Sequence, residues 1–271
     1  MSMSIDIIAS QVTHLISQGC TTYDILRVAA HYRRIELETH LFNTLGGRIA
    51  EGPFKGMSYL GQAHASTLSP KLLGTYEQEL QDAVMKLSKY YDHFLDIGCA
   101  EGYYTTGMAL QANIRSVIGI DINPESLTAA RQLAKLNNIE SKCKFTEDLI
   151  SAAKNLNKNS LVMIDVDGAE LKAIDDLFCY SSIDTIQTCC FIIETDYNLD
   201  RSSNKDRIIE TMVNKGFKLD ANIKQSNEKR LSKIAEGLTR SFLDLAIYSM
   251  EGRPSDQSWL ILTSDKALSN S

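Results

Sequence analysis

Short apolar runs alternate with amphipathic stretches from residue 93 to the end of the chain. The stretches between the runs repeat their apolar positions at helical spacing. The apolar runs predict strands at about 93–97, 116–121, 142–146, 160–166 and 185–195, followed by one from Phe217 and one at Trp259–Thr263. Regular alternation of strand and helix predicts an α/β fold, a doubly wound and mostly parallel sheet covered by helices on both faces.

The first part of the chain has a different pattern. Apolar positions at helical spacing predict helices at 5–18, 23–42 and 75–89. Between the second and third of these, residues 43–70 contain several glycines and little periodicity. A connection this long is usually a functional loop, and the alternative is a floppy connector.

This connection carries polar and basic side chains that suit a polar or anionic substrate, and we expect Lys55 and Tyr59 to bind it. We therefore divide the chain into two parts. Residues 1–89 form a helical extension with a substrate-facing loop, and residues 90–271 form the α/β domain.

The turn after the first predicted strand is the most informative segment. Asp96 ends the strand, Gly98 and Gly102 follow within the turn, and a helical pattern opens at Tyr103. Asp121 ends the second predicted strand. A strand, a glycine turn and a helix with free N–H groups form a nucleotide site, in which a later carboxylate binds ribose hydroxyls. Glycine also lets the backbone approach a ligand closely.

The acids in this turn indicate which cofactor it binds. The dinucleotide pattern G-x-G-x-x-G leaves the turn free of acids, whereas this turn reads D-x-G-x-x-x-G with Asp96 and Glu101. Two carboxylates repel a pyrophosphate but attract the ammonium and sulfonium of S-adenosylmethionine (SAM). The turn resembles motif I of the class I methyltransferases, and Asp121 matches their ribose-binding acid. The alternative is plain strand–helix packing.

Two segments resemble the FkbM-type methyltransferases: Ile164-Asp-Val-Asp-Gly-Ala-Glu170 and the turn running to Tyr104. The resemblance covers roughly residues 50–200, and Asp167 stands where that family more often has Glu. It implies a seven-stranded class I sheet with an antiparallel last strand. It also implies O-methylation of small molecules, glycans or secondary metabolites, and a place for Tyr76 and Glu77 at the cofactor pocket.

Acids at the carboxyl ends of the later strands are candidates for chemistry, because ligands of doubly wound sheets bind there. Asp148 is expected to bond the adenine amino group or, alternatively, to cap the next helix. Asp165 is the first candidate for the base that accepts the acceptor's proton, and His64 is the second. Glu194 is expected to contact the acceptor. Asp165 and Glu194 could instead hold Mg²⁺, although their spacing does not require a metal.

Composition limits the partners. Asp and Glu number 34 against 28 Lys and Arg, a net charge of −6 without basic blocks, which predicts no nucleic-acid partner. No apolar run approaches the ~20 residues of a membrane span, and the first residues lack a signal pattern, so we expect a cytoplasmic protein with no membrane partner. The six cysteines show no metal-ligand spacing with histidine. A homo-oligomer is compatible with the sequence.

These expectations combine into one function, SAM-dependent methyl transfer to oxygen on a small polar, glycan or secondary-metabolite acceptor. N- or carboxyl-methylation of a small molecule and a non-catalytic SAM-binding module are the alternatives. The expected cofactor contacts are Asp96, Gly98, Cys99, Ala100, Glu101, Gly102, Tyr104, Asp121, Ile122, Asp148, Tyr76 and Glu77.

Overall fold

The computed structural model describes residues 5–64, 66–197, 202–225, 232–249, 251 and 257–268. Its contacts group the chain into two compact units. The helical unit comprises the described residues of Met1–Gln62, Ser66–Tyr76 and Lys229–Glu251. The sheet unit comprises those of Ala63–Ala65, Glu77–Glu228 and Gly252–Ser271. A domain boundary at residue 89 stays a prediction.

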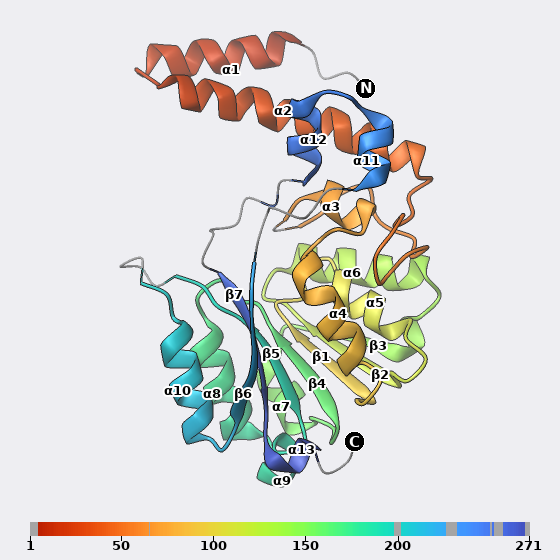
Figure 1. Ribbon diagram of the computed structural model, residues 1–271, viewed down its shortest axis with the longest axis vertical. Helices are drawn as coiled ribbons and strands as arrows, with labels where there is room; N and C mark the ends of the chain where they lie inside the picture. Colours follow the sequence, from red (N-terminus) through yellow and green to blue (C-terminus); the bar gives the residue numbers. More distant parts are fainter. Residues whose placement is uncertain are drawn as a thin grey trace. The chain divides into compact units, whose positions relative to one another are not determined.

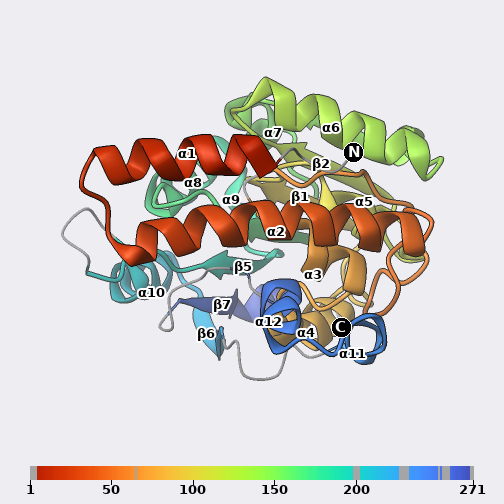
Figure 2. The same ribbon diagram turned by 90° about the horizontal axis from the view of Figure 1, so that it is seen from above.

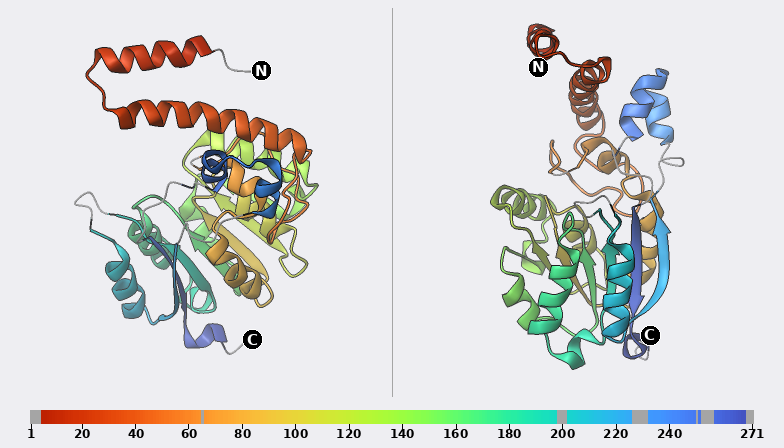
Figure 3. Two further views of the ribbon diagram at one scale, coloured as in Figure 1. Left: turned by 45° about the horizontal axis from the view of Figure 1, so that its top comes forward. Right: turned by 90° about the vertical axis from the view of Figure 1, so that its left-hand side faces the viewer.

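The sheet unit is built on seven strands in the order β3-β2-β1-β4-β5-β7-β6 (Figure 1). The strands are β1 His93–Ile97, β2 Ser116–Ile120, β3 Cys143–Thr146, β4 Ser160–Ile164, β5 Cys190–Glu194, β6 Lys218–Lys224 and β7 Ser258–Thr263. The first five run parallel, and β7 is antiparallel to both of its neighbours, β5 and β6. The two blue strands β6 and β7 lie at one edge (Figure 3, right). The expected fold class is confirmed.

Helices cover the sheet, and side chains that alternate along each strand supply the core. On one face, Leu95 and Ile97 of β1 and Ile193 of β5 pack with Ile174 and Met212. Figure 1 shows α8 and α10 on the side of the sheet away from α4 and α5. The helices of this unit are α4 Gln78–Leu87, α5 Tyr103–Ala109, α6 Pro124–Leu136, η1 Glu140–Lys142, α7 Leu149–Lys154, α8 Glu170–Tyr180, α9 Ile183–Ile186, α10 Lys205–Asn214 and α13 Asp265–Leu268.

Two of the expected elements are shorter than their apolar patterns. The helix expected from residue 75 begins only at Gln78, because Glu77 has a left-handed backbone with φ +46°. The run expected as a strand from residue 185 begins as the end of helix α9, and β5 starts at Cys190. Apolar periodicity reports a buried face and does not locate such ends.

The helical unit contains α1 Ile5–Ser17, α2 Thr22–Thr44, α3 Leu68–Leu73, α11 Lys233–Leu238 and α12 Phe242–Ser249. Helix α1 lies alongside α2 (Figure 2). Helix α2 begins with a capping box, in which Thr21 and Asp24 each accept a hydrogen bond from the other's backbone N–H. The connection expected to be irregular at residues 43–70 runs into a short helix, α3, which begins at Leu68. No helix in the described ranges is both long and apolar enough to cross a bilayer.

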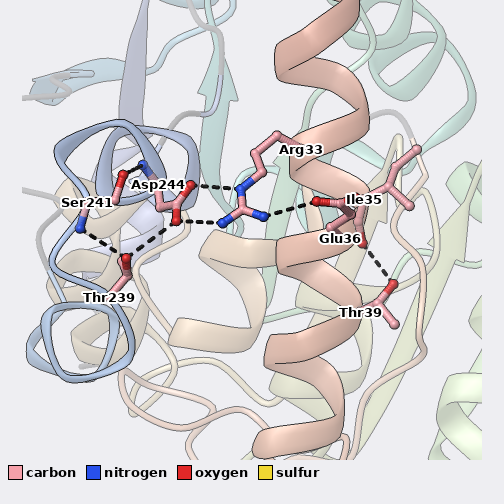
Figure 4. Close-up of polar contacts among 7 residues, drawn as sticks. All are labelled: Arg33, Ile35, Glu36, Thr39, Thr239, Ser241 and Asp244. Atoms are coloured by element: carbon pink, nitrogen blue, oxygen red, sulfur yellow. Dashed lines mark hydrogen bonds and ion pairs between the residues drawn. The ribbon is translucent and has the colours of Figure 1, made fainter. Parts of the chain in front are cut away.

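An ion pair joins α2 to α12 (Figure 4). The Arg33 guanidinium donates from Nε to Oδ1 of Asp244 at 2.9 Å and from Nη2 to Oδ2 at 2.7 Å. Asp244 is buried, and the hydrogen bonds from Arg33 lower the pKa of its carboxyl. Arg33 also donates to Glu36 at 3.0 Å, where both side chains are exposed. The bidentate pair is the stronger of the two, because its geometry is fixed at both oxygens.

Asp244→Ala should therefore lower the free energy of unfolding by about 1–2 kcal/mol, since it removes two charge-assisted hydrogen bonds to a half-exposed partner. Glu36→Ala is the matched control and should change it by less than about 0.5 kcal/mol. Urea unfolding followed by circular dichroism measures both. The same loss in the two variants would show that the Arg33–Asp244 pair does not stabilise α12.

Candidate cofactor and active site

The turn between β1 and α5 can be formed only with glycine at residue 98. Gly98 has φ +92°, and a Cβ placed on it would lie 1.6 Å from the backbone oxygen of Asp165. Gly102 has φ +87° and also faces α6, because its Cβ would lie 3.2 Å from that of Ala130. The turn therefore lies against the end of β4 at Gly98 and against α6 at Gly102, in backbone conformations that glycine adopts without strain.

Asp121 holds this turn to the end of β2. Its Oδ2 accepts from the backbone N–H of Ala100 at 2.9 Å, and its Oδ1 accepts from that of Asn123 at 2.8 Å. The side chain is half-buried. Each carboxylate oxygen has more than one lone pair, so Asp121 can keep both contacts and still accept from ribose hydroxyls.

Asp96 lies beneath the turn and is buried. Its Oδ2 accepts from the Thr105 hydroxyl at 2.6 Å. Burial raises the pKa of its carboxyl to about 7 from an ordinary 3.8, and the nearby charges of Asp165 and Asp121 add to this rise. Burial also raises the pKa of the Cys99 thiol. Because negative charge is unfavourable here, a bound cation would be stabilised.

Two hydrogen bonds connect the turn to residues earlier in the chain. The backbone N–H of His64 donates to Oε2 of the buried Glu101 at 3.0 Å. The hydroxyl of Tyr104, at the start of α5, donates to Oε2 of Glu77 at 2.6 Å. The second candidate base, His64, therefore lies beside the turn. Glu77 is held by Tyr104 of α5, the helix that follows the turn.

Three carboxylates form a cluster at the mouth of the sheet. Each of Glu77, Asp165 and Glu194 offers one oxygen, and these oxygens all lie within 4.8 Å of one another. Glu77 and Glu194 are buried, and Asp165 is half-buried. The structure thus brings together Asp165 and Glu194, which the sequence places at the ends of β4 and β5, and adds Glu77. We call these three residues the carboxylate cluster.

Other expected site residues have different surroundings. Asp148 accepts from the backbone N–H of Ser151 at 2.8 Å and so caps α7, the alternative left open above. Ile122 is 89% exposed. Tyr59 and Tyr76 are buried within the helical unit, and Lys55 is exposed there. The cofactor and substrate contacts assigned to these residues stay predictions.

Some polar residues of the site carry no clear sequence signal. The Gln225 amide Nε2 donates to Oε1 of Glu194 at 2.6 Å from the end of β6. Thr105 supplies the partner of Asp96, as described above. Glu170, in contrast, accepts from the backbone of Gly168 at 2.9 Å and from Asn204 Nδ2 at 2.7 Å, so it joins α8 to the start of α10. A single polar residue in an amphipathic stretch is not distinctive, and only the tertiary contact reveals it.

Residues 89–230, more than half of the chain, match the family model described as "Methyltransferase domain". The chain belongs to this methyltransferase family. It is an enzyme that uses SAM. No curated protein matches it. The FkbM-type subfamily is not part of this finding.

Several solved structures are similar in fold. A ribosomal protein L11 methylase from Lactobacillus delbrueckii subsp. bulgaricus has 18% identity and TM-score 0.45, with 69% of this chain and 78% of that one covered. A putative rRNA methylase from Clostridium thermocellum has 12% identity and TM-score 0.46, with 68% of this chain and 94% of that one covered. M. jannaschii TYW2 in complex with AdoMet has 12% identity and TM-score 0.42, with 68% of this chain and 74% of that one covered. At these identities the likeness concerns the fold alone.

The expected exclusion of nucleic acid is contradicted. The structures of similar fold include the putative rRNA methylase above, an rRNA methylase from Streptococcus thermophilus and a complex of aTrm5 with tRNALeu. The exclusion rested on the net charge of the whole chain and on its lack of basic blocks. Net charge does not determine the local field at a substrate surface, so it cannot exclude this class of acceptor.

The residues of the turn fit SAM. Gly98 has a left-handed backbone that lets the turn pass close to the end of β4, the buried acids Asp96 and Glu101 suit a cationic ligand, and Asp121 directly follows β2, where a ribose partner is expected. These residues would hold the cofactor. Asp165, which follows β4, would lie between the cofactor and the acceptor.

The raised pKa of Asp96 predicts a pH dependence of stability. The folded chain keeps this proton up to about pH 7, whereas the unfolded chain loses it near 3.8. The free energy of unfolding should therefore fall as pH rises through this window, on the order of 1.4 kcal/mol for each unit of pKa difference. Asp96→Asn should flatten the fall, measured by urea unfolding without cofactor. Glu147→Gln, an exposed acid, is the control, and an unchanged slope in Asp96→Asn would contradict this assignment.

Asp121→Ala should weaken SAM binding by about 1.5–3 kcal/mol, roughly 10- to 100-fold, because the ribose loses a charged acceptor. Asp121→Asn keeps one acceptor oxygen and should lose less. Isothermal titration calorimetry gives both affinities, and thermal unfolding shows whether the turn still folds without the Ala100 contact. Wild-type affinity in a folded Asp121→Ala variant would remove Asp121 from the ribose site.

Proposed function

We propose that this enzyme methylates a hydroxyl oxygen on a small polar or glycan-like acceptor. The observation that carries the proposal is the contact of Gly98 with the Asp165 backbone, which brings the carboxylate cluster beside the turn assigned to SAM. The FkbM-type resemblance of Ile164–Glu170 supports oxygen as the methylated atom. On this proposal the acceptor binds at the carboxyl ends of β4 and β5.

When bound, SAM supplies an electrophilic methyl group. The chain's own residues position the reactants and manage one proton. Asp165 accepts the proton of the acceptor hydroxyl on one of its carboxylate oxygens as the hydroxyl oxygen attacks the methyl group. Glu77, held by Tyr104, and Glu194, held by Gln225, orient the acceptor through hydrogen bonds to its other polar groups. His64 is the alternative base.

Methylation of an amine is the second candidate function. Three carboxylates close together favour an acceptor that carries positive charge, because the charge offsets their mutual repulsion. The same repulsion disfavours an acceptor carboxylate, so carboxyl-methylation ranks last. An amine acceptor would use the same alignment of nucleophile and methyl group.

Asp165→Asn should lower kcat by about 10²- to 10⁴-fold, because the amide cannot accept the proton, while the Kd for SAM stays nearly unchanged. Asp167→Asn is the matched control, since this neighbouring acid is exposed and should retain wild-type kcat. Methyl-labelled SAM incubated with the enzyme and host extract, then with the acceptor found there, supplies the assay. Full turnover by Asp165→Asn would exclude Asp165 as the base, and label in RNA or protein would overturn the proposed acceptor class.

A further inference from the structure

The carboxylate cluster has the ligand chemistry of a hard divalent cation. Its three oxygens come from Glu77 before α4, Asp165 after β4 and Glu194 at the end of β5. Oxygens on opposite sides of a cation at 2.0–2.6 Å are about 4–5 Å apart. The mutual distances within 4.8 Å therefore allow the three oxygens to contact one ion.

Gln225 adds an independent observation. Its side chain is 5% exposed, and its amide is turned to the cluster, because Nε2 donates to Oε1 of Glu194 at 2.6 Å. The amide nitrogen of Gln225, and not its oxygen, must face the Glu194 carboxylate, because two acceptor oxygens would repel each other. The amide oxygen Oε1 is then buried and has no hydrogen-bond partner among the described residues. A buried amide oxygen without a donor costs free energy unless a ligand satisfies it.

We propose that Glu77, Asp165, Glu194 and the Gln225 amide oxygen bind one divalent cation, with Mg²⁺ the natural occupant. All four ligands are oxygens, which Mg²⁺ prefers, and histidine and cysteine ligands, which favour transition metals, are not among them. The cation also offsets the repulsion of three carboxylates held in a mostly buried position.

The role of this cation rests on the proposed function, whereas its binding does not. Bound beside the turn, the cation would take the acceptor oxygen as a further ligand and lower the pKa of the hydroxyl. Each carboxylate has two oxygens, so Asp165 can contact the cation with one and receive the hydroxyl proton on the other. In the transfer, the acceptor oxygen would form its bond to the methyl carbon as the methyl–sulfur bond breaks, S-adenosylhomocysteine would leave, and the hydroxyl proton would stay on Asp165.

Titration of the full SAM-free chain with MgCl₂, and in parallel with MnCl₂, tests the site. Calorimetry measures the binding, and the fluorescence of Trp259, the single tryptophan, reports it locally because Trp259 pairs with Glu194 across β5 and β7. We expect saturable binding of one cation. Glu194→Gln should weaken it at least tenfold and Gln225→Leu by less, whereas the control Glu147→Gln should bind as the wild type does.

Thermal unfolding without added cation separates a lost ligand from a lost fold. Glu194→Gln should unfold at or above the wild-type temperature, because it relieves repulsion in the cluster, yet its stabilisation by Mg²⁺ should be smaller. No saturable binding of either metal, or equal binding by wild type and Glu194→Gln, would overturn the site. Normal cation binding with methyl transfer to another atom would count against the proposed function alone.

Discussion

The close approach of Gly98 to the Asp165 backbone is the constraint on which the site depends. No side chain can replace the glycine hydrogen there, because a Cβ would overlap a backbone oxygen. Strands β1 and β4 are neighbours, and Ile97 pairs with Ile164, so the segments after the two strands leave the sheet at the same level. The cofactor turn and the first carboxylate of the acceptor side therefore come from adjacent strand ends, and their distance is set by backbone packing.

The chemistry of the site follows from negative charge gathered around that contact. Asp96 is buried with a raised pKa, Asp121 and Glu101 border the turn, and the carboxylate cluster lies beyond Asp165. Such an arrangement costs free energy in the isolated chain. A cationic cofactor and a divalent cation would each recover part of that cost, so the same electrostatics that select SAM over a dinucleotide also favour a metal at the acceptor side.

Much of this could be predicted from sequence, for physical reasons that also explain the failures. Apolar runs ending in Asp96, Asp121, Asp165 and Glu194 marked strands and their carboxyl ends, because a parallel sheet buries its strands on both faces. Glu77 joins the cluster from a left-handed residue before α4, and Gln225 reaches Glu194 from the end of β6, which pairs with β7 through a register shift between Leu219 and Ala221. Neither is a local property. Net charge could not exclude a nucleic-acid acceptor, because it averages over the whole surface.

A crystal structure of the chain with S-adenosylhomocysteine and Mg²⁺ would show directly whether the Gly98 turn holds the cofactor beside the carboxylate cluster. We expect the homocysteine portion over Gly98–Gly102, the ribose hydroxyls on Asp121 and the sulfur facing Asp165. The cofactor bound elsewhere, or bound here with its sulfur directed away from the carboxylate cluster, would contradict this placement.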